Sequence, residues 1–288
     1  WRPDGIVEGT DTWDILTTEV ENETRDYPWE HINKFIGGIS KGQLTTITAG
    51  TGIGKSLFVK ELAYSLLEQG ETIGGIFLEE GIKRTVQAFC SIPLNVPLHL
   101  KPDNVDRDKL REAWESTAGS NRLYLYDSFG SVETDNLLSR IRYLNKSLGC
   151  SFIILDHISI VVSGLDQDNE RKAIDIVMTK LRSLVEETGI GLILVSHLKR
   201  LQGDKSHEDG ATTSLSHLRG SAAIAQLSDC VIGLERDQQS EDRNKTQVRV
   251  LKNRTSGITG VAGELRYNTD TGRLTEGNAF DKEEEVVF

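Results

Sequence analysis

A glycine-rich loop from Ala49 to Ser56 could bind phosphate groups. It follows a β-branched run and leads into the apolar start of a helix, the context in which such loops hold the phosphates of a nucleotide. The loop consists of Ala49, Gly50, Thr51, Gly52, Ile53, Gly54, Lys55 and Ser56. Its backbone N–H groups can surround phosphate oxygens, while Lys55 reaches the β- and γ-phosphates and the Ser56 hydroxyl ligates Mg²⁺. The sequence therefore predicts a nucleotide site, with Ala49 in place of the first glycine of the common pattern.

Acidic residues follow two further apolar runs. Asp156 ends the run that starts at Phe152, and Glu79 and Glu80 directly follow residues 73–78. Because ligands bind outside the carboxyl ends of the strands in an α/β sheet, these carboxylates are expected near the phosphate loop. Asp156 suits the Mg²⁺-side acid, and one of the two glutamates suits the base that polarises the attacking water. Side chains alternate along an extended segment, so only one glutamate faces the site, and the residues alone leave open which one.

A third apolar run, 191–196, ends in His197, which could sense the γ-phosphate or be an ordinary hydrogen-bonded histidine. Polar loops follow it. Lysines, arginines and exposed glycine N–H groups in such loops suit the phosphates of a nucleic-acid strand. The candidate DNA contacts are Lys199, Arg200, Lys205, Arg219, Gly220 and Ser221. An ordinary solvated loop is the alternative, because Asp204, Glu208 and Asp209 lie among these cations.

Lys252 and Arg254 end another predicted strand, far along the chain from the phosphate loop. Cations in such a place resemble the arginine finger that completes the nucleotide site of a neighbouring subunit. Since surface lysines and arginines are common, an ordinary surface position is the alternative interpretation.

Apolar β-rich runs alternate with helical patterns through most of the chain. Strands are expected at residues 44–48, 73–78, 123–126, 152–156 and 191–196, and then at 230–235, 246–252 and 262–267. Helices are expected at residues 56–69, 82–92, 107–118, 134–148 and 170–188. The alternation predicts an α/β fold with a mostly parallel sheet and helices on both faces. The last three strands predict an antiparallel extension at one edge of that sheet.

The chain has 288 residues and 37% hydrophobic content, which fits one substantial globular domain with appendages. A net charge of −11 argues against a diffuse basic surface that coats nucleic acid, so a nucleic-acid site must be local. No apolar run approaches the length of a membrane span, and the three cysteines have no paired spacing, which is typical of reduced thiols in a cytosolic protein. The chain starts at Trp1 and its only methionine is Met178, so we expect a longer protein upstream.

The chain divides into an N-terminal arm, a core domain and an acidic C-terminal tail. Their expected bounds are residues 1–27, 28–275 and 276–288. In the arm, Trp13, Leu16 and Val20 fall at i, i+3 and i+7, which predicts a short amphipathic helix. Its apolar stripe must dock either on its own domain or on a neighbouring subunit. The tail carries several acids and ends in Phe288.

Six motifs of this chain occur in the order and spacing found in ring helicases of the DnaB type. They are residues 49–56, 78–80, 154–159, 195–199, 218–221 and 252–254. The chain is most similar to the helicase half of T7-type phage helicase-primases and to their mitochondrial relative Twinkle, over roughly residues 28 to 275. The resemblance implies a RecA-like core and a hexameric ring that moves 5′ to 3′ on single-stranded DNA. It also implies that Mg²⁺ and a nucleoside triphosphate, ATP or dTTP, bind between subunits.

The resemblance also implies roles for single residues. Glu80 is implied as the catalytic base, Lys55 and His197 as further catalytic groups, and Arg254 as the finger supplied in trans. The other implied nucleotide contacts are Arg171, Gln226, Arg236, Lys252 and Tyr267, of which Arg236 and Tyr267 flank the base and Gln226 links nucleotide state to the DNA loops. Ala225 stands where phage relatives carry a basic residue, and no zinc motif or primase region is present in this chain.

The leading hypothesis is a hexameric NTP-driven replicative DNA helicase. A RecA-like filament protein shares the P-loop, the acid and the trans cation and is the main alternative, whereas Glu80 and Asp156 argue against a scaffold that does not hydrolyse nucleotide. The expected partners are single-stranded DNA, further copies of the chain, a primase domain upstream or in a separate chain, and a DNA polymerase bound through the tail. We expect no membrane partner, and we expect the cytoplasm of a phage-infected bacterial host.

Overall fold

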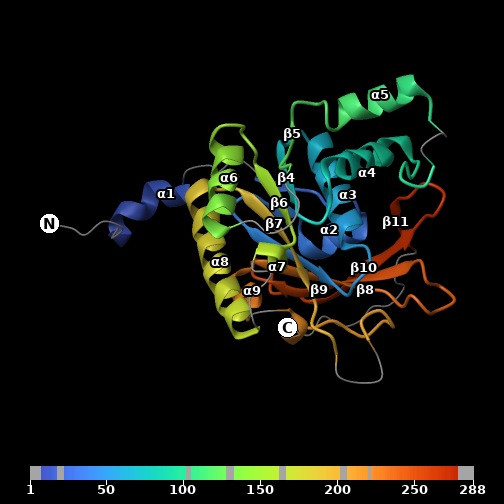
Figure 1. Ribbon diagram of the computed structural model, residues 1–288. Coiled ribbons are helices and arrows are strands. Elements are labelled where there is room, and N and C mark those ends of the chain that lie inside the picture. Colours follow the sequence, from blue (N-terminus) through green and yellow to red (C-terminus); the bar gives the residue numbers. More distant parts are fainter. Residues whose placement is uncertain are drawn as a thin grey trace.

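A nine-stranded sheet forms the centre of the protein, as the computed structural model shows (Figure 1). The structure describes residues 8–17, 23–101, 105–127, 133–161, 167–201, 206–219 and 222–277. The strands of the large sheet are β3 (Leu44–Ala49), β4 (Ile73–Phe77), β5 (Leu123–Leu125), β6 (Phe152–Asp156), β7 (Gly191–His197), β8 (Cys230–Glu235), β9 (Lys245–Asn253), β10 (Gly260–Tyr267) and β11 (Leu274–Glu276). A separate two-stranded sheet pairs β1 (Thr24–Arg25) with β2 (Ile39–Ser40).

The strands of the large sheet lie in the order β11-β10-β9-β8-β3-β7-β6-β4-β5. From β8 to β5 every neighbouring pair is parallel, and β9, β10 and β11 continue the sheet with antiparallel pairs. This arrangement confirms the predicted α/β class and its antiparallel edge extension. The sequence did not predict the short strands β1, β2 and β11.

Helices cover both faces of the sheet (Figure 1). The helices are α1 (Trp13–Thr17), α2 (Glu30–Ile36), α3 (Lys55–Glu68), α4 (Ile82–Leu94), α5 (Arg107–Ser116), α6 (Thr134–Lys146), α7 (Ile158–Val161), α8 (Gln167–Thr188) and α9 (Ala222–Leu227), with 3-10 turns η1 (Gly9–Thr12) and η3 (Leu215–His217). Buried residues of α2 and α3 share one apolar core with one face of the sheet, while those of α6, α8 and α9 share a second core with the other face.

Strand β6 illustrates why the parallel strands could be recognised in the sequence. Ile154 packs into the core beside α3, whereas Ile153 and Leu155 pack into the core beside α6 and α8. Because both faces are covered, every residue of β6 is buried and the strand is a continuous apolar run. Among the described residues, no helix combines the length and the apolar character that crossing a bilayer would need.

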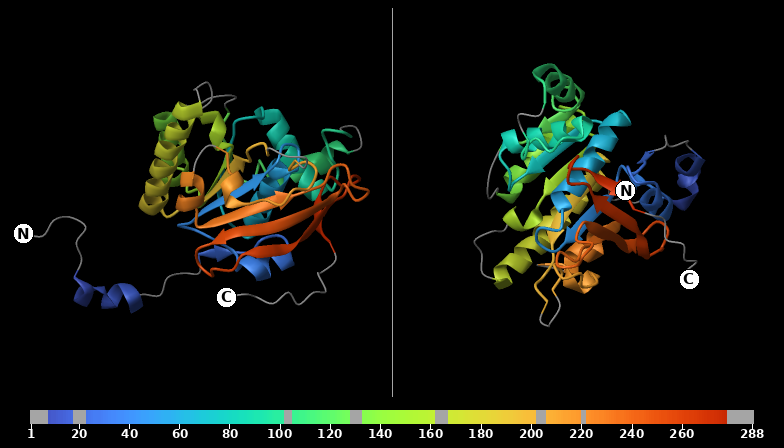
Figure 2. Two further views of the ribbon diagram at one scale, coloured as in Figure 1. Left: turned by 90° about the horizontal axis from the view of Figure 1, so that it is seen from below. Right: turned by 90° about the vertical axis from the view of Figure 1, so that its right-hand side faces the viewer.

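The N-terminal arm contains η1 and α1, as the apolar spacing predicted for this region. Its helix stands away from the sheet in the views of Figures 1 and 2. Trp13 is 68% exposed and Leu16 is 77% exposed, so the apolar stripe of α1 is uncovered within this chain. Val20, the third residue of the predicted stripe, lies outside the described residues.

Candidate active site

The predicted phosphate loop connects β3 to α3 at the carboxyl edge of the parallel strands. Gly52 and Gly54 adopt φ values of 71° and 112°, which residues with a Cβ rarely adopt, so both glycines are needed for the turn. Lys55 is the first residue of α3, and its Nζ donates to the carbonyl oxygens of Ala49 and Gly50 at 3.1 and 2.8 Å. The ammonium group is therefore folded back over the loop that would hold the phosphates.

Carboxylates surround the Lys55 ammonium group. Burial lowers the pKa of Lys55 to about 8, and the charges of Asp156, Glu79 and Glu208 oppose that shift. These three acids thus lie within electrostatic range of the group that would contact the β- and γ-phosphates. Asp156 and Glu79 come from strand ends, as predicted. Glu208 comes from the loop after β7 and had no predicted role at the nucleotide site.

The two predicted magnesium ligands lie together. Ser56 Oγ donates a hydrogen bond to Asp156 Oδ2 over 2.7 Å, which joins the first turn of α3 to the end of β6. Burial raises the pKa of the Asp156 carboxyl, and the hydrogen bond from Ser56 acts in the opposite direction. A hydroxyl and a carboxylate beside a phosphate loop are the oxygen ligands that Mg²⁺ takes in such sites, so this pair fits the cation.

The end of β4 separates the two glutamates. Glu80 Oε2 accepts a hydrogen bond from Lys60 Nζ at 2.5 Å, and the Lys60 side chain is only 4% exposed. Glu79 Oε1 lies 2.9 Å from His157 Nε2 and within electrostatic range of Lys55. Glu79, rather than Glu80, therefore faces the phosphate loop. The implied role of Glu80 as the base does not fit this geometry, because α3 places Lys60 beneath the strand end and Lys60 binds the Glu80 carboxylate.

His197 lies beside the phosphate loop because it pairs with Ala49 in the register of β7 and β3. Its ring packs edge to face on His157, with 4.1 Å between the ring centroids. Burial lowers the pKa of His197 to about 3, and the charge of Lys55 adds to the shift, so the imidazole is neutral at neutral pH. A neutral imidazole can form a hydrogen bond to a phosphate without adding charge.

Glu79, His157 and His197 form one cluster, in which one potential ligand atom from each residue lies within 4.8 Å of those of the other two. The sequence analysis placed His157 in a motif but gave it no role. Its position directly after Asp156 was the only available signal.

Arg236 and Tyr267 lie at the same edge of the sheet as the phosphate loop, since β8 and β10 both run in the direction of β3. A single turn contacts both residues. Arg236 donates to the carbonyl oxygen of Arg243, and the Tyr267 N–H donates to the carbonyl oxygen of Asn244 at 2.9 Å. The structure therefore places the two implied base-flanking residues near each other.

Lys252 and Arg254 lie at the opposite edge of the sheet. Asn253, between them, pairs with Cys230 at the start of β8, and Cys230 pairs with Thr45 of β3. Ala49, where the phosphate loop begins, is four residues further along β3, or about 13 Å at the rise of an extended strand. The two cations are thus directed away from the phosphate loop of their own chain.

The end of α9 holds these cations in place. Lys252 Nζ donates to three carbonyl oxygens there, including that of Gln226 at 3.0 Å. Arg254 donates to Asp229 Oδ1 at 2.9 Å and to the Gln226 carbonyl oxygen at 3.0 Å, while half of its side chain remains exposed. Gln226 therefore belongs to the same edge as Lys252 and Arg254, and not to the edge that carries its own phosphate loop.

The predicted DNA contacts lie on loops that start at the active edge. Leu198 and Leu218 form an isolated bridge that joins the two loop segments beside His197. Lys199, Arg200 and Arg219 are exposed, and Arg219 lies 3.6 Å from Glu170 on α8. Arg171, the next residue of α8, is also exposed. Lys205, Gly220 and Ser221 lie outside the described residues.

Comparisons with known proteins agree with this arrangement. A family model described as the DnaB-like helicase C terminal domain matches residues 27–276. The chain is 38% identical over 283 residues to the DNA helicase/primase of Enterobacteria phage T3, covering 95% of this chain and 50% of that protein. It is 24% identical over 249 residues to the replicative DNA helicase DnaC of Bacillus subtilis (strain 168), covering 82% of this chain and 54% of that protein. The chain therefore spans about half the length of these curated relatives.

Solved structures share the fold. The structure of a DnaB-like replicative helicase described with its interactions with primase matches with a TM-score of 0.74 at 19% identity, covering 96% of this chain and 68% of that chain. Another solved structure, of an isolated ATPase domain, matches with a TM-score of 0.72 at 19% identity, covering 93% of this chain and 96% of that chain. These matches show a RecA-like ATPase fold. Together with the family model over residues 27–276, they place the chain in the DnaB-like helicase C-terminal domain family.

Proposed function

We propose that this chain is the motor domain of a hexameric replicative DNA helicase. It hydrolyses ATP or dTTP, moves 5′ to 3′ along single-stranded DNA and unwinds the duplex ahead. The observation that carries the proposal is the distribution of the nucleotide residues between two edges of the sheet. The phosphate loop and Asp156 lie at one edge, and Lys252 and Arg254 lie at the other. A second copy that presents its Arg254 edge to the phosphate loop would complete the site.

Within that site each residue has a distinct task. Mg²⁺ held by Ser56 and Asp156 would neutralise charge on the phosphates. Glu79 polarises the attacking water, which its place beside His157 and near Lys55 supports. His197 contacts the γ-phosphate as a neutral hydrogen-bonding group. Arg254 from the neighbour stabilises the charge of the transition state, a contribution of about 10³ to 10⁵ in rate in other enzymes.

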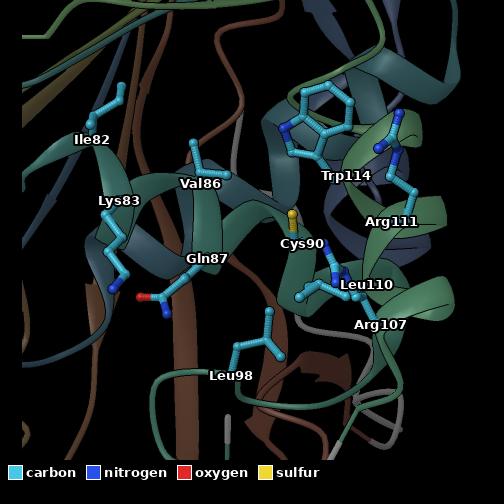
Figure 3. Close-up of a pocket in the computed structure, with 10 residues that line it drawn as sticks. All are labelled: Ile82, Lys83, Val86, Gln87, Cys90, Leu98, Arg107, Leu110, Arg111 and Trp114. Carbon is cyan, nitrogen blue, oxygen red and sulfur yellow. The ribbon is translucent and has the colours of Figure 1, made fainter. Parts of the chain in front are cut away.

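An apolar groove between α4 and α5 supports assembly through the arm. The cavity has a volume of about 550 Å³. Figure 3 shows its lining, which consists of Ile82, Lys83, Val86, Gln87, Cys90, Leu98, Arg107, Leu110, Arg111 and Trp114. We propose that α1 of a neighbouring copy docks there, with its exposed Trp13 and Leu16 against the apolar wall. The acidic residues of the arm and the basic rim of the groove have complementary charge.

The remaining partners follow from the same proposal. Single-stranded DNA binds the loops that carry Lys199, Arg200 and Arg219 and, outside the described residues, Lys205, Gly220 and Ser221. The acidic tail, which also lies outside the described residues, binds a DNA polymerase. A primase acts from an upstream domain or a separate chain, and the name of the phage T3 relative includes both activities. The site of action is the cytoplasm of an infected bacterium.

Complementation between two inactive variants tests the shared site. Arg254→Ala and Lys55→Ala should each abolish hydrolysis alone. Random mixing in equal amounts should restore about a quarter of the sites, because only an interface with Lys55 from one copy and Arg254 from the next is intact. Mixing wild type with the double variant gives the matched control for subunit exchange. Hydrolysis that stays proportional to protein concentration in the fully monomeric range would exclude the shared site.

The shape of the assembly separates the two leading functions. Electron micrographs with nucleotide and single-stranded DNA should show closed rings. Extended filaments would favour the RecA-like alternative, and a strand-exchange assay would then replace the unwinding assay.

The groove has its own test. Trp13→Ala with Leu16→Ala should weaken nucleotide-dependent assembly in sedimentation experiments, and so should Trp114→Ala on the groove side. Tyr143→Ala is the matched control, because Tyr143 is a 58% exposed aromatic residue on α6, outside the groove. Equal assembly of all these variants would show that the arm docks elsewhere.

A further inference from the structure

The loop after β7 touches the phosphate loop at one point. Glu208 Oε1 accepts a hydrogen bond from the Thr51 N–H at 2.9 Å. A Cβ added to Gly50 would lie 2.8 Å from the His207 Cβ and 3.0 Å from the Glu208 carboxylate, so only glycine allows this approach. A segment that follows a candidate DNA contact at Lys199 is thereby bonded to the backbone of the nucleotide site.

Several contacts fix Glu208 in this place. Its carbonyl oxygen accepts a hydrogen bond from the Gln238 N–H at 2.9 Å, just beyond the end of β8. Asp209 forms a bridge with Asp237, and Gly210 packs so closely on Asp237 that a Cβ would lie 2.9 Å from the Asp237 Cβ. The segment is therefore clamped between the phosphate loop and the turn after β8, and it is not a freely solvated loop.

The Glu208 carboxylate is charged at neutral pH. Burial raises its pKa, but hydrogen bonds from backbone N–H groups, including that of Thr51, outweigh burial and hold the pKa below its ordinary value. The carboxylate also interacts with the Lys55 ammonium group. It thus presents to the phosphate loop the same chemistry as a phosphate oxygen, which is a negative charge that accepts N–H hydrogen bonds.

We propose that Glu208 sets the nucleotide affinity of the phosphate loop and couples it to the position of the DNA loop. This inference rests on the proposed function. Phosphate groups and the Glu208 carboxylate repel each other and require the same backbone N–H groups, so a bound nucleotide weakens the contact between Glu208 and Thr51. Single-stranded DNA that draws the loop outward removes the competing carboxylate. Because such coupling is reciprocal, DNA tightens nucleotide binding by the same factor by which nucleotide tightens DNA binding.

Two substitutions separate the charge of Glu208 from its hydrogen bond. Glu208→Gln removes the charge and keeps an acceptor of the same size, whereas Glu208→Ala removes both. We expect both to tighten binding of a fluorescent, non-hydrolysable ATP analogue by about fivefold in the absence of DNA, the scale of one like charge removed across partly screened solvent. Glu241→Gln is the matched control, because it removes an exposed acid from the turn after β8 that contains Gln238.

The decisive measurement is the ratio of analogue affinities with and without an oligo(dT) strand, in the presence of Mg²⁺. Wild type and Glu241→Gln should show a ratio well above one, and both Glu208 variants should show a ratio near one. Thermal unfolding checks that each variant is folded. Glu208 variants that keep the wild-type affinity and ratio would overturn the inference and leave the proposed function intact. Failure of the wild type itself to bind nucleotide or DNA would instead refute the proposed function.

Discussion

The two glutamates after β4 should fail in different ways when each is replaced by glutamine. Glu79→Gln removes the carboxylate that faces the phosphate loop, so turnover should fall by about 10² to 10⁴, the range for a general base. Nucleotide affinity and stability should change little. Glu80→Gln instead removes the partner of Lys60, whose side chain is 4% exposed, while that of Glu80 is 17% exposed. Its main effect should be on folding.

The magnitude for Glu80→Gln follows from the buried pair. An ammonium group left without its counter-charge in such a place costs about 3 kcal/mol of the free energy of unfolding. In a chain of this size that corresponds to a loss of roughly 6–12 °C in melting temperature. Adding Lys60→Met to Glu80→Gln removes the unpaired charge, so the double variant should recover part of the loss.

Calorimetry and steady-state hydrolysis with saturating nucleotide and single-stranded DNA measure the two effects on the same samples. Glu115→Gln is the control, because that carboxylate belongs to an exposed pair with Arg111 on α5. An unchanged melting temperature with abolished turnover for Glu80→Gln, together with normal turnover for Glu79→Gln, would refute the assignment and restore Glu80 as the base.

Three other predictions concern binding and reactivity. Lys55→Ala should lose nucleotide affinity, measured by fluorescence titration, because it removes the cation at the β- and γ-phosphates, whereas Glu79→Gln should keep it. Lys199→Ala should weaken single-stranded DNA binding, measured by anisotropy, without changing DNA-independent hydrolysis; unchanged DNA affinity would place the track elsewhere. Burial raises the pKa of Cys150 and of Cys230 to about 12, so these thiols should resist iodoacetamide at pH 8 in the folded protein and react on unfolding, as mass spectrometry would show.

Local pattern was enough to predict most of the fold. Strands buried on both faces are uninterrupted apolar runs, and for this reason β3, β6 and β8 agree with the expected ranges to within a residue. The missed elements, including β11 and α2, are short, and they owe their structure to distant partners. Trp29 just before α2, for example, donates its indole N–H to the carbonyl oxygen of Leu274 at 3.0 Å. No local periodicity encodes such a contact.

The candidate site was predictable where chemistry is tied to strand ends, and not where it depends on tertiary partners. The phosphate loop, Ser56 and Asp156 come together as expected. The choice between Glu79 and Glu80 could not be predicted, because it depends on Lys60 of α3, 20 residues away in sequence. Glu208 was missed for the same reason, since its partner Thr51 is 157 residues distant.

Dividing the nucleotide residues between opposite edges of the sheet has a numerical consequence for the proposed assembly. A closed ring has as many interfaces as subunits, whereas an open row of the same copies has one fewer. At one end of the row a phosphate loop has no Arg254, and at the other end an Arg254 has no phosphate loop. Closing the ring would therefore add one working site at a single step, and the capacity for hydrolysis would belong to the interfaces rather than to the chains.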